Sequence, residues 1–374
     1  MRVGVLGISI DDPCGVRDHA ALLADALAAL DVSCSLHWLS RGDGSLRDGR
    51  SDVGAWAAAS ARELRQDGAE AVLLHYSVFA FSHRGLPLLL QPVLAALRAH
   101  GLPLVSFMHE LAYPWHMNGL RGKVWAASQR LALRGLVRDS AGIVVSADAR
   151  AEWLRTRAWL PARPTAVAPV FSNLPVVTGE QAPTRGRLGL FGYAHEGVAV
   201  EIVLDALARA RERQGELELM LLGAPGRSSP AGERWRRAAA ERGLAHALVF
   251  SERLPAEQLS TALASCELLL FAERGGPTSR KTTLAASLAS ARPLVALDGP
   301  NSWGELLAAR AVTVVPAQAG ALAYAILALH EDEQARTSQG ARGRAFAAQT
   351  MSVEHSASVV ANALRRAIAD RRAL

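Results

Sequence analysis

The sequence predicts an α/β protein of two tandem Rossmann-like, doubly wound parallel-sheet domains with a cleft between them. Two observations lead to this fold class. Short apolar runs rich in β-forming residues alternate along the whole chain with stretches of helical period, which is typical of parallel sheets covered by helices on both faces. The 374 residues exceed what one ordinary core accommodates and suit two domains of roughly 150–200 residues each.

The first half of the chain contains six expected strands. Residues 2–7 form the first, a polar loop follows at 8–16, and an amphipathic helix is expected at 17–30. The other strands are expected at 32–38, 71–75, 103–109, 142–146 and 165–170, with helical stretches between most of them. Residues 172–187 have little periodicity and contain Pro175, Gly179 and Pro183. This segment is the expected linker.

A second alternating series follows the linker. Its strands are expected at 187–191, 218–222, 247–250, 267–271, 293–297 and 312–315. Its helices are expected at 198–213, 232–242, 255–264, 282–290 and 319–329, and the tail at 333–373 is largely helical in pattern. We therefore expect an N-terminal domain at 1–178, a C-terminal domain at 179–350 and a terminal helix within 351–374.

Composition excludes several classes of protein. Half of the residues are hydrophobic and 20% are charged, which argues against a disordered or fibrous chain. The sequence shows neither a signal-peptide pattern nor an apolar run of about 18–20 residues. Three cysteines without CxxC spacing suggest neither a disulfide framework nor a zinc site. We expect a cytoplasmic protein that binds no metal.

The net charge of +6 comes almost entirely from arginine, since Lys123 and Lys281 are the only lysines. There is no basic tail and no segment of interleaved aromatic and basic residues, so nucleic acid is not an expected partner. Four basic residues lie largely on one side of an expected helix: Lys123, Arg130, Arg134 and Arg138. Such a helix can rest on anionic lipid or can simply present a solvated face.

Ligands of doubly wound sheets bind in the loops that follow the strands, where the carboxyl ends of the strands meet. The fourth strand ends in His109 and Glu110. A histidine and a carboxylate at this place can orient hydroxyl groups or assist proton transfer. The alternative is a histidine satisfied by the backbone beside an ordinary exposed carboxylate. The first loop brings Gly15 to a helix N-terminus, where free N–H groups attract anions. The alternative is a plain turn between strand and helix.

Residues 270–284 hold the most informative motif. Gly275 and Gly276 permit a close approach of the backbone to a ligand, and Arg280 and Lys281 add charge at the start of a helix. Hydroxyl groups come from Ser279, Thr282 and Thr283. The pattern favours diphosphate binding over a solvated helix start, although it is not a Walker A loop. Near the linker, Gly192 and Gly197 could frame a phosphate or sugar with Tyr193 or His195 in contact, or form an ordinary turn.

The chain resembles the retaining family-4 (group 1) glycosyltransferases with the GT-B fold. The likeness is carried by Asp12-Pro-Cys-Gly-Val-Arg-Asp-His-Ala, Phe107-Met-His-Glu110, Leu188-Gly-Leu-Phe-Gly192, Leu221-Leu-Gly223, Leu288-Ala-Ser-Ala-Arg-Pro-Leu-Val295 and Met351-Ser-Val-Glu354. The last of these resembles the entry to a terminal helix that crosses back onto the N-terminal domain.

Two departures from the family pattern stand out. Many members carry an Arg and a Lys after the first C-terminal strand, where this chain has Tyr193 and Glu196 or Gly197. Many also carry two glutamates eight positions apart, which fall here at Thr278 and Ala286. The segment 276–284 instead resembles a subgroup with Ser-x-Arg-Arg-Gly-Thr, which would make Arg280 and Lys281 the replacement cations.

The resemblance implies transfer of a sugar, with retention, from a nucleoside diphosphate sugar to a hydroxyl acceptor: a glycan, a lipid-linked acceptor or a small molecule. The nucleotide sugar is a co-substrate, and no cofactor or metal is expected. The implied catalytic residues are His109 and Glu110. The implied acceptor or sugar loop holds Cys14, Gly15, Asp18 and His19, and the implied donor site holds Gly192, Tyr193, Glu273, Gly276, Thr278, Ser279, Arg280, Lys281, Thr282 and Thr283.

Two alternatives remain open. The missing cations and glutamates also fit a catalytically degenerate transferase that acts as a partner or scaffold. A nucleotide-sugar epimerase on the same double-Rossmann architecture is the other, although no carboxylate cluster favours it. We expect a cytoplasmic protein, with peripheral attachment to the inner membrane as an option.

Overall fold

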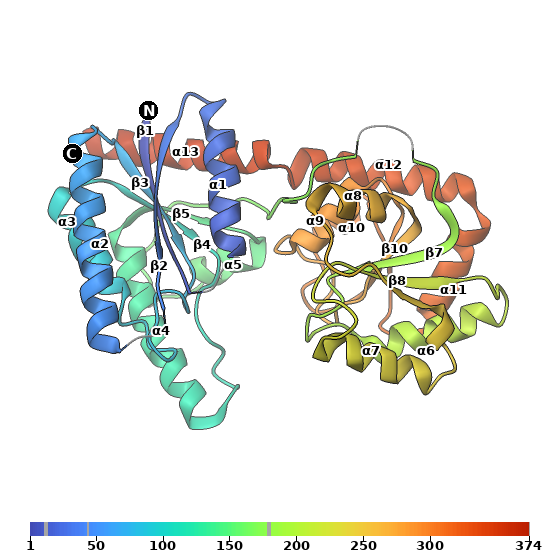
Figure 1. Cartoon of the computed structure of the whole chain (residues 1–374). Coiled ribbons are helices and arrows are strands. Elements are labelled where there is room, and N and C mark those ends of the chain that lie inside the picture. The colour runs from blue at the N-terminus through green and yellow to red at the C-terminus, as the bar shows by residue number, and fades with distance from the viewer. Residues whose placement is uncertain (11–13, 43–44, 178–180, 374) are drawn as a thin grey trace. The chain divides into compact units, whose positions relative to one another are not determined.

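The computed structural model describes residues 1–10, 14–42, 45–177 and 181–373. The chain folds into two compact units (Figure 1). Unit 1 comprises Met1–Pro169 together with Val353–Leu374, and unit 2 comprises Val170–Ser352. The chain therefore leaves unit 1, builds unit 2 and returns to unit 1 for its final helix.

Unit 1 is built on a sheet of six parallel strands in the order β2-β1-β3-β4-β5-β6. Successive residues of a strand point to opposite faces, and both faces of the inner strands β1, β3, β4 and β5 are buried, so these strands are largely apolar. In the central strand β3 every residue is buried. The strands are β1 (Arg2–Ser9), β2 (Ser33–Ser40), β3 (Ala71–Tyr76), β4 (Leu104–Met108), β5 (Ser140–Val145) and β6 (Thr165–Val167).

Helices cover both faces of this sheet. On one face, α2 (Leu46–Gln66), α3 (Leu90–His100), α4 (Gly119–Asp139) and α5 (Asp148–Arg155) share a core with β1, β3, β4 and β5. On the other face, α1 (Gly15–Ala28) packs against α13 (Val353–Arg372).

Polar contacts hold α13 onto unit 1 as well. The Ser356 hydroxyl donates to the carbonyl of Pro169 at 3.0 Å, and Arg365 donates to the carbonyl of Leu30 at 2.9 Å. One face of the helix is buried, through Val360, Leu364 and Ala367 among others. The amphipathic pattern of the tail is therefore explained by burial of this face within unit 1.

Unit 2 has its own sheet of six parallel strands, in the order β12-β11-β10-β7-β8-β9. Counted from the start of the unit, this is the order six-five-four-one-two-three of the dinucleotide-binding folds. The strands are β7 (Thr184–Phe191), β8 (Glu218–Leu222), β9 (Leu248–Phe250), β10 (Cys266–Phe271), β11 (Leu294–Leu297) and β12 (Thr313–Val315).

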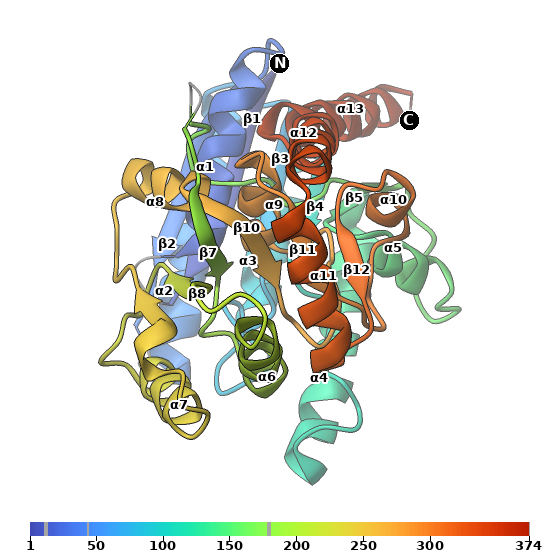
Figure 2. The ribbon, with the colours of Figure 1, turned by 90° about the vertical axis from the view of Figure 1, so that its right-hand side faces the viewer.

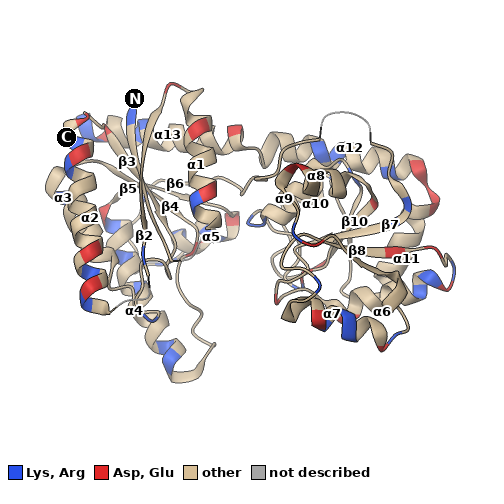
Figure 3. Ribbon diagram, viewed as in Figure 1, with Lys and Arg blue, Asp and Glu red and all other residues tan. Residues whose placement is uncertain are grey.

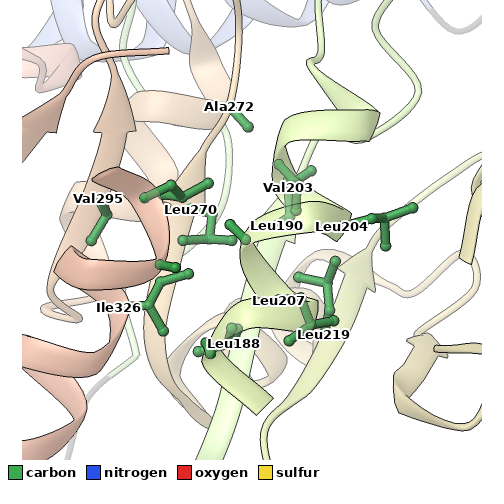
Figure 4. Packing of buried hydrophobic residues seen from close by; sticks show 14 of the residues in the cluster. Leu188, Leu190, Val203, Leu204, Leu207, Leu219, Leu270, Ala272, Val295 and Ile326 are labelled. Carbon is green, nitrogen blue, oxygen red and sulfur yellow. The ribbon is translucent and has the colours of Figure 1, made fainter. Parts of the chain in front are cut away.

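Two layers of helices cover the sheet of unit 2. One contains α6 (Val200–Arg211), α7 (Pro230–Ala240) and α11 (Ala319–Glu331), and α6 and α11 lie side by side (Figure 2). Figure 4 shows their contact with the sheet, where Val203 and Leu207 of α6 meet Leu190 of β7. The other layer contains α8 (Ala256–Ala264), α9 (Thr282–Ala289), α10 (Gly304–Ala308) and α12 (Glu333–Thr350).

The prediction of two doubly wound parallel sheets is confirmed, and each of the twelve expected strands overlaps an observed one. The largest differences in strand boundaries occur at two places. β7 begins at Thr184, within the expected linker, and pairs with β10 there. β6 ends at Val167, before the expected end at 170. The helix α10 was not expected, since five residues carry too little periodicity to be recognised. The expected domain boundary at 178/179 lies outside the described residues.

Candidate functional site

Each sheet has one point where the strand order reverses, and these points locate the candidate sites. In unit 1 the reversal lies between β1 and β3, and in unit 2 it lies between β7 and β10. Open α/β sheets bind ligands outside the carboxyl ends of the strands at such a point. The sequence motifs that predict ligand contacts follow these strands or their neighbours.

In unit 1, His109 directly follows β4, and its backbone N–H donates to the carbonyl of Tyr76 at the end of β3. Arg150 of α5 donates to the backbone carbonyl of His109, which ties the loop from the other side. The Glu110 carboxylate accepts a hydrogen bond from the Ser77 hydroxyl at 3.1 Å. Both candidate catalytic residues are thus held in defined positions at the carboxyl edge of the sheet.

A third residue, His75, was not expected at this place, because it lies within the buried run of β3. Its Nδ1 lies 3.0 Å from Nε2 of His109. Burial is the main cause that lowers the pKa of His109 well below its ordinary value, with His75, His19 and Arg150 adding to it. Burial and then His19 likewise lower the pKa of His75. Both rings are therefore neutral at pH 7. A histidine at the end of a strand next to the reversal point was the available signal.

The first loop of unit 1 contributes one buried side chain. His19, in the second turn of α1, lies edge-on to the His109 ring at a centroid distance of 5.2 Å, and burial lowers its pKa to about 4. Asp18 and Gly15 are exposed at the start of α1, and Cys14 is the half-buried residue before it. Gly15 does not have a positive φ, so its backbone conformation does not require glycine. Asp12 and Pro13 lie outside the described residues.

In unit 2 the loop after β7 has a part that is buried in the core and a part that is exposed. Gly192 has a φ of +82°, and a Cβ there would lie 2.8 Å from Cγ2 of Thr283, so glycine is required. The expectation that Tyr193 contacts the donor is wrong for its side chain. Tyr193 is fully buried, and its hydroxyl accepts a hydrogen bond from the backbone N–H of Gly226 at 2.7 Å. It fills the core beneath the loop, and burial raises its pKa.

The loops after β7 and β10 bring three charged or polar side chains together. Nζ of Lys281 lies 2.9 Å from Oε2 of Glu273 and 3.1 Å from Nε2 of His195. Backbone pairing aligns the two loops that carry them, because Val198 and Glu273 form an antiparallel bridge. Lys281 is also the residue that precedes the first turn of α9, whose first N–H groups have no partner within the helix.

The contacts of His195 decide which of its ring nitrogens carries the proton. Its Nδ1 accepts a hydrogen bond from the backbone N–H of Gly197 at 3.1 Å, so a neutral ring carries its proton on Nε2. That N–H and the Lys281 ammonium are both donors, and two donors cannot satisfy each other. An anionic oxygen that accepts from both would remove the conflict. This pair of donors occupies the region where the expected Arg and Lys are missing.

The remaining candidate residues of unit 2 differ in their packing and exposure. Gly276 has a φ of +81°, and a Cβ there would lie 2.2 Å from Oγ of Ser302, so the loop packs too tightly for any other residue. Ser279 is buried, and its carbonyl accepts from the N–H of Val170 at 2.8 Å. Arg280 and Thr282 are exposed at the start of α9, and Thr278 and Thr283 are half-buried.

The helix expected to carry four basic residues on one side is α4. Not all four basic side chains point to solvent. Leu131 is 73% exposed and Val124 is 50% exposed, so both apolar side chains lie on the surface. Arg130 instead turns toward the protein, donating to the carbonyl of Tyr113 and lying 4.5 Å from the ring centroid of Trp115. The exposed surface of α4 therefore combines apolar side chains with basic ones. Figure 3 marks the basic positions along this helix in blue.

The membrane-spanning criterion gives a negative result: among the described residues, no helix is both long and apolar enough to cross a bilayer. Comparison with curated protein sequences gives no match. A family model described as glycosyl transferases group 1 matches residues 185–332, which run from β7 to the start of α12. The matched segment contains the loops after β7 and β10.

Solved structures resemble the whole chain. A glycosyltransferase from Rickettsia africae has a TM-score of 0.71 at 12% identity, covering 98% of this chain and 99% of that one. Sucrose-phosphate synthase from Thermosynechococcus elongatus has a TM-score of 0.69 at 15% identity, covering 98% and 99%. Anabaena HepE in complex with UDP has a TM-score of 0.69 at 14% identity, covering 98% and 100%. The chain therefore has the two-domain fold of the GT-B glycosyltransferases, and its residues 185–332 carry the sequence pattern of the glycosyl transferases of group 1.

Proposed function

We propose that this protein transfers a glycosyl unit from a nucleoside diphosphate sugar to a hydroxyl acceptor, with retention of configuration. The observation that carries the proposal is the meeting of Lys281 and His195 at the strand-order reversal of unit 2, within the segment that matches the glycosyltransferase family. Retention follows from the resemblance to the retaining family. The HepE structures solved with UDP and with UDP-glucose make these compounds the first to test.

The donor diphosphate is proposed to bind at the N-terminus of α9. Lys281 and the Nε2–H of His195 would donate to phosphate oxygens, and Arg280 is exposed beside them. The first N–H groups of α9 add the positive end of a helix dipole. Glu273 holds the Lys281 ammonium at 2.9 Å, so the cation is positioned before the ligand arrives. Gly192 and Gly276 allow the loop backbones to pack closely around this place.

These groups would stabilise the leaving diphosphate without a metal ion. Charge develops on the diphosphate as the glycosidic bond to it breaks, and fixed cations and N–H groups aimed at that charge lower the barrier. Metal independence is thus part of the proposal, since the ammonium and the helix N-terminus occupy the role that Mg²⁺ plays elsewhere.

Unit 1 is proposed to bind the acceptor or the reacting sugar through His109, Glu110 and the loop at 14–19. His109 is neutral at pH 7 because burial lowers its pKa well below its ordinary value, so it would orient a hydroxyl group by hydrogen bonding and would not act as an acid. Glu110, fixed by Ser77, can accept a hydrogen bond from a second hydroxyl or take a proton from it.

The acceptor is proposed to be a glycan, a lipid-linked molecule or another hydroxyl compound. Peripheral contact of α4 with the inner face of a membrane belongs to this proposal. It is supported by exposed Leu120, Val124 and Leu131, which lie beside Lys123 and Arg134 on the same helix.

Nucleotide binding by charge-removal variants tests the donor site. We expect the wild-type protein to bind UDP or another nucleoside diphosphate in isothermal titration calorimetry. The double variant Arg280→Ala/Lys281→Ala should bind it at least about 100-fold more weakly, because each of the two charge-assisted hydrogen bonds contributes about 1.5–3 kcal/mol. His195→Ala should weaken binding in the same direction.

Arg344→Ala is the matched control, since Arg344 is an exposed arginine of α12 in the same unit. It should leave nucleotide affinity unchanged. Unaltered affinity and turnover in Arg280→Ala/Lys281→Ala would refute the assignment of the diphosphate site. A wild-type protein that binds none of the UDP, GDP and TDP sugars would refute the transferase proposal and favour a scaffold. Conversion of the donor without an acceptor would favour an epimerase.

A further inference from the structure

The geometry of His75 and His109 at the carboxyl edge of the unit 1 sheet determines which ring nitrogens carry a proton. Nδ1 of His75 and Nε2 of His109 lie 3.0 Å apart, which is an ordinary hydrogen-bond distance. Both rings are neutral, so each carries one proton on one of its two nitrogens. Exactly one of the two facing nitrogens must hold the proton between them. Two arrangements remain, one with His75 as donor and one with His109 as donor.

The other nitrogen of His75 distinguishes the two arrangements. Among the described residues, Nε2 of His75 is buried and has no hydrogen-bond partner. If His109 were the donor, the proton of His75 would lie on this Nε2 and would be a buried N–H without an acceptor. If His75 is the donor, Nε2 is only a buried lone pair. Orphaned buried N–H groups are rarer than under-satisfied acceptors, so the structure favours His75 Nδ1–H as the donor.

We propose that His75 is a positioning residue that fixes His109 in the tautomer protonated on Nδ1. This inference rests on the proposed function, because it assigns the chemical role of His109 in that site. With Nε2 occupied by His75, the group that His109 presents to a ligand is Nδ1–H, a hydrogen-bond donor. The partner must then be an acceptor oxygen of the sugar or of the acceptor molecule. His109 therefore selects oxygen atoms with a free lone pair.

The surroundings of the pair keep both rings in place. Phe107 packs face to face with the His109 ring at a centroid distance of 4.8 Å and with the His75 ring at 5.3 Å. The His19 ring lies edge-on to both, at centroid distances of 5.2 Å from His109 and 5.8 Å from His75. The backbone of His109 is held by Tyr76 on one side and by Arg150 on the other. A donor that is fixed before binding loses little entropy when a ligand accepts from it.

A metal ion is the competing explanation for three neighbouring histidines. One ring nitrogen from each of His19, His75 and His109 lies within 4.8 Å of the other two. Tetrahedral coordination with metal–nitrogen bonds of about 2.0–2.1 Å would separate each pair of ligand nitrogens by roughly 3.3 Å. The 3.0 Å between His75 and His109 is shorter than this and matches a shared proton. The geometry therefore favours the hydrogen-bonded pair.

The tautomer can be observed without any substrate. In the full-length protein labelled with ¹⁵N-histidine, a long-range ¹⁵N–¹H correlation spectrum separates protonated from unprotonated ring nitrogens. We expect a protonated Nδ1 and an unprotonated Nε2 for His109, whose signals are identified by their loss in His109→Asn. His75→Asn keeps an N–H donor at the position of Nδ1 and should preserve this pattern. His75→Phe removes the donor and should give a mixture of tautomers.

Turnover tests the positioning role with the same variants. Using the nucleotide sugar that the wild-type protein accepts, kcat of His75→Phe should fall roughly two- to tenfold, the loss typical of one hydrogen bond. His75→Asn should recover most of it. The control His100→Asn, at the end of α3, should change neither the spectrum of His109 nor kcat.

Three results would overturn the inference. A His109 ring protonated on Nε2 would show the opposite tautomer, whatever the protein's activity. About one equivalent of bound zinc in the purified wild-type protein would show that a metal replaces the shared proton. Unchanged kcat in His75→Phe, together with normal wild-type turnover, would remove the positioning role and leave the transferase proposal intact. A separate outcome concerns the proposed function. If His109 is protonated on Nδ1 but the protein has no transferase activity, the proposed function and the catalytic role of His109 are refuted, and the tautomer assignment stands.

Discussion

Glu267, the second residue of β10, has a carboxylate that is buried in unit 2. Its Oε2 accepts a hydrogen bond from the backbone N–H of Gly186 at 2.7 Å and lies 2.8 Å from Nδ1 of His330. Arg336 approaches its other oxygen at 3.5 Å. A buried charge is tolerated only when partners replace the lost water. This residue therefore joins β10, β7 and α11 through polar contacts at the edge of the sheet opposite the candidate site.

Removing this carboxylate should destabilise the protein. In Glu267→Ala the N–H of Gly186, the ring of His330 and the guanidinium of Arg336 lose a buried partner at once. We expect the free energy of unfolding to fall by about 3–5 kcal/mol, the range measured when one member of a buried pair is removed. Urea denaturation followed by circular dichroism measures this loss.

The control for this variant is Glu257→Ala, in which an exposed glutamate of α8 is removed. Its free energy of unfolding should change by no more than about 0.5 kcal/mol. Equal stability of the two variants would show that the contacts of Glu267 contribute nothing.

On the scale of a single element, α4 is unusual among the helices of unit 1. It exposes Leu120 by 80% and Leu131 by 73%, and basic residues accompany them along the helix (Figure 3). Exposed apolar side chains cost free energy in water and gain it at a lipid interface. Nearby lysine and arginine side chains add attraction to anionic headgroups. This combination is what the proposed membrane contact requires.

Vesicle binding tests this surface. The wild-type protein should co-sediment with vesicles of phosphatidylglycerol and phosphatidylcholine more strongly than with phosphatidylcholine alone. Leu120→Asp/Leu131→Asp should lower the partition coefficient at least about tenfold, because each leucine contributes roughly 1.5–3 kcal/mol when it leaves water.

Tyr324→Asp provides the comparison, since Tyr324 is a 75% exposed aromatic residue of α11 in unit 2. Its vesicle binding should equal that of the wild type. Equal co-sedimentation of all three proteins with anionic vesicles would assign any lipid attraction to general charge and not to α4.

For the whole molecule, the buried histidines of unit 1 link stability to pH. Burial lowers the pKa of His19 from 6.5 to about 4 in the folded protein. Between these values the unfolded chain binds a proton that the folded protein excludes, so acid favours unfolding. The stabilisation is complete above pH 6.5 and is lost as the pH falls toward 4. His75 and His109 act in the same direction, because burial lowers their pKa too.

We therefore expect the free energy of unfolding to fall steadily from pH 7 to pH 4.5, with His19 contributing roughly 3 kcal/mol of the fall. Urea denaturation at several pH values gives this profile. His19→Phe removes one titrating group and keeps a ring of similar shape, so its profile should be flatter than that of the wild type. Parallel profiles would mean that His19 ionises in the same way in the folded and unfolded states.

The sequence by itself determined the strands and much of the donor loop. Parallel strands buried on both faces are apolar along most of their length, and the alternation of β-rich runs with helical stretches located all twelve strands. Glycine at positions 192 and 276 was recognisable because only glycine tolerates the backbone at both places. Lys281 stood out because it is one of two lysines. Each of these signals is local in the chain.

The tertiary structure alone decided which polar residues meet. Tyr193 and His195 are two positions apart, yet one is buried in the core and the other is exposed beside Lys281. His75 was recognised only as part of a strand. The pairing of β3 with β4 places it against His109. Burial and contact between residues distant in sequence depend on how strands pair and helices cover them. A residue's type and its neighbours along the chain therefore cannot fix its charge state or its partner.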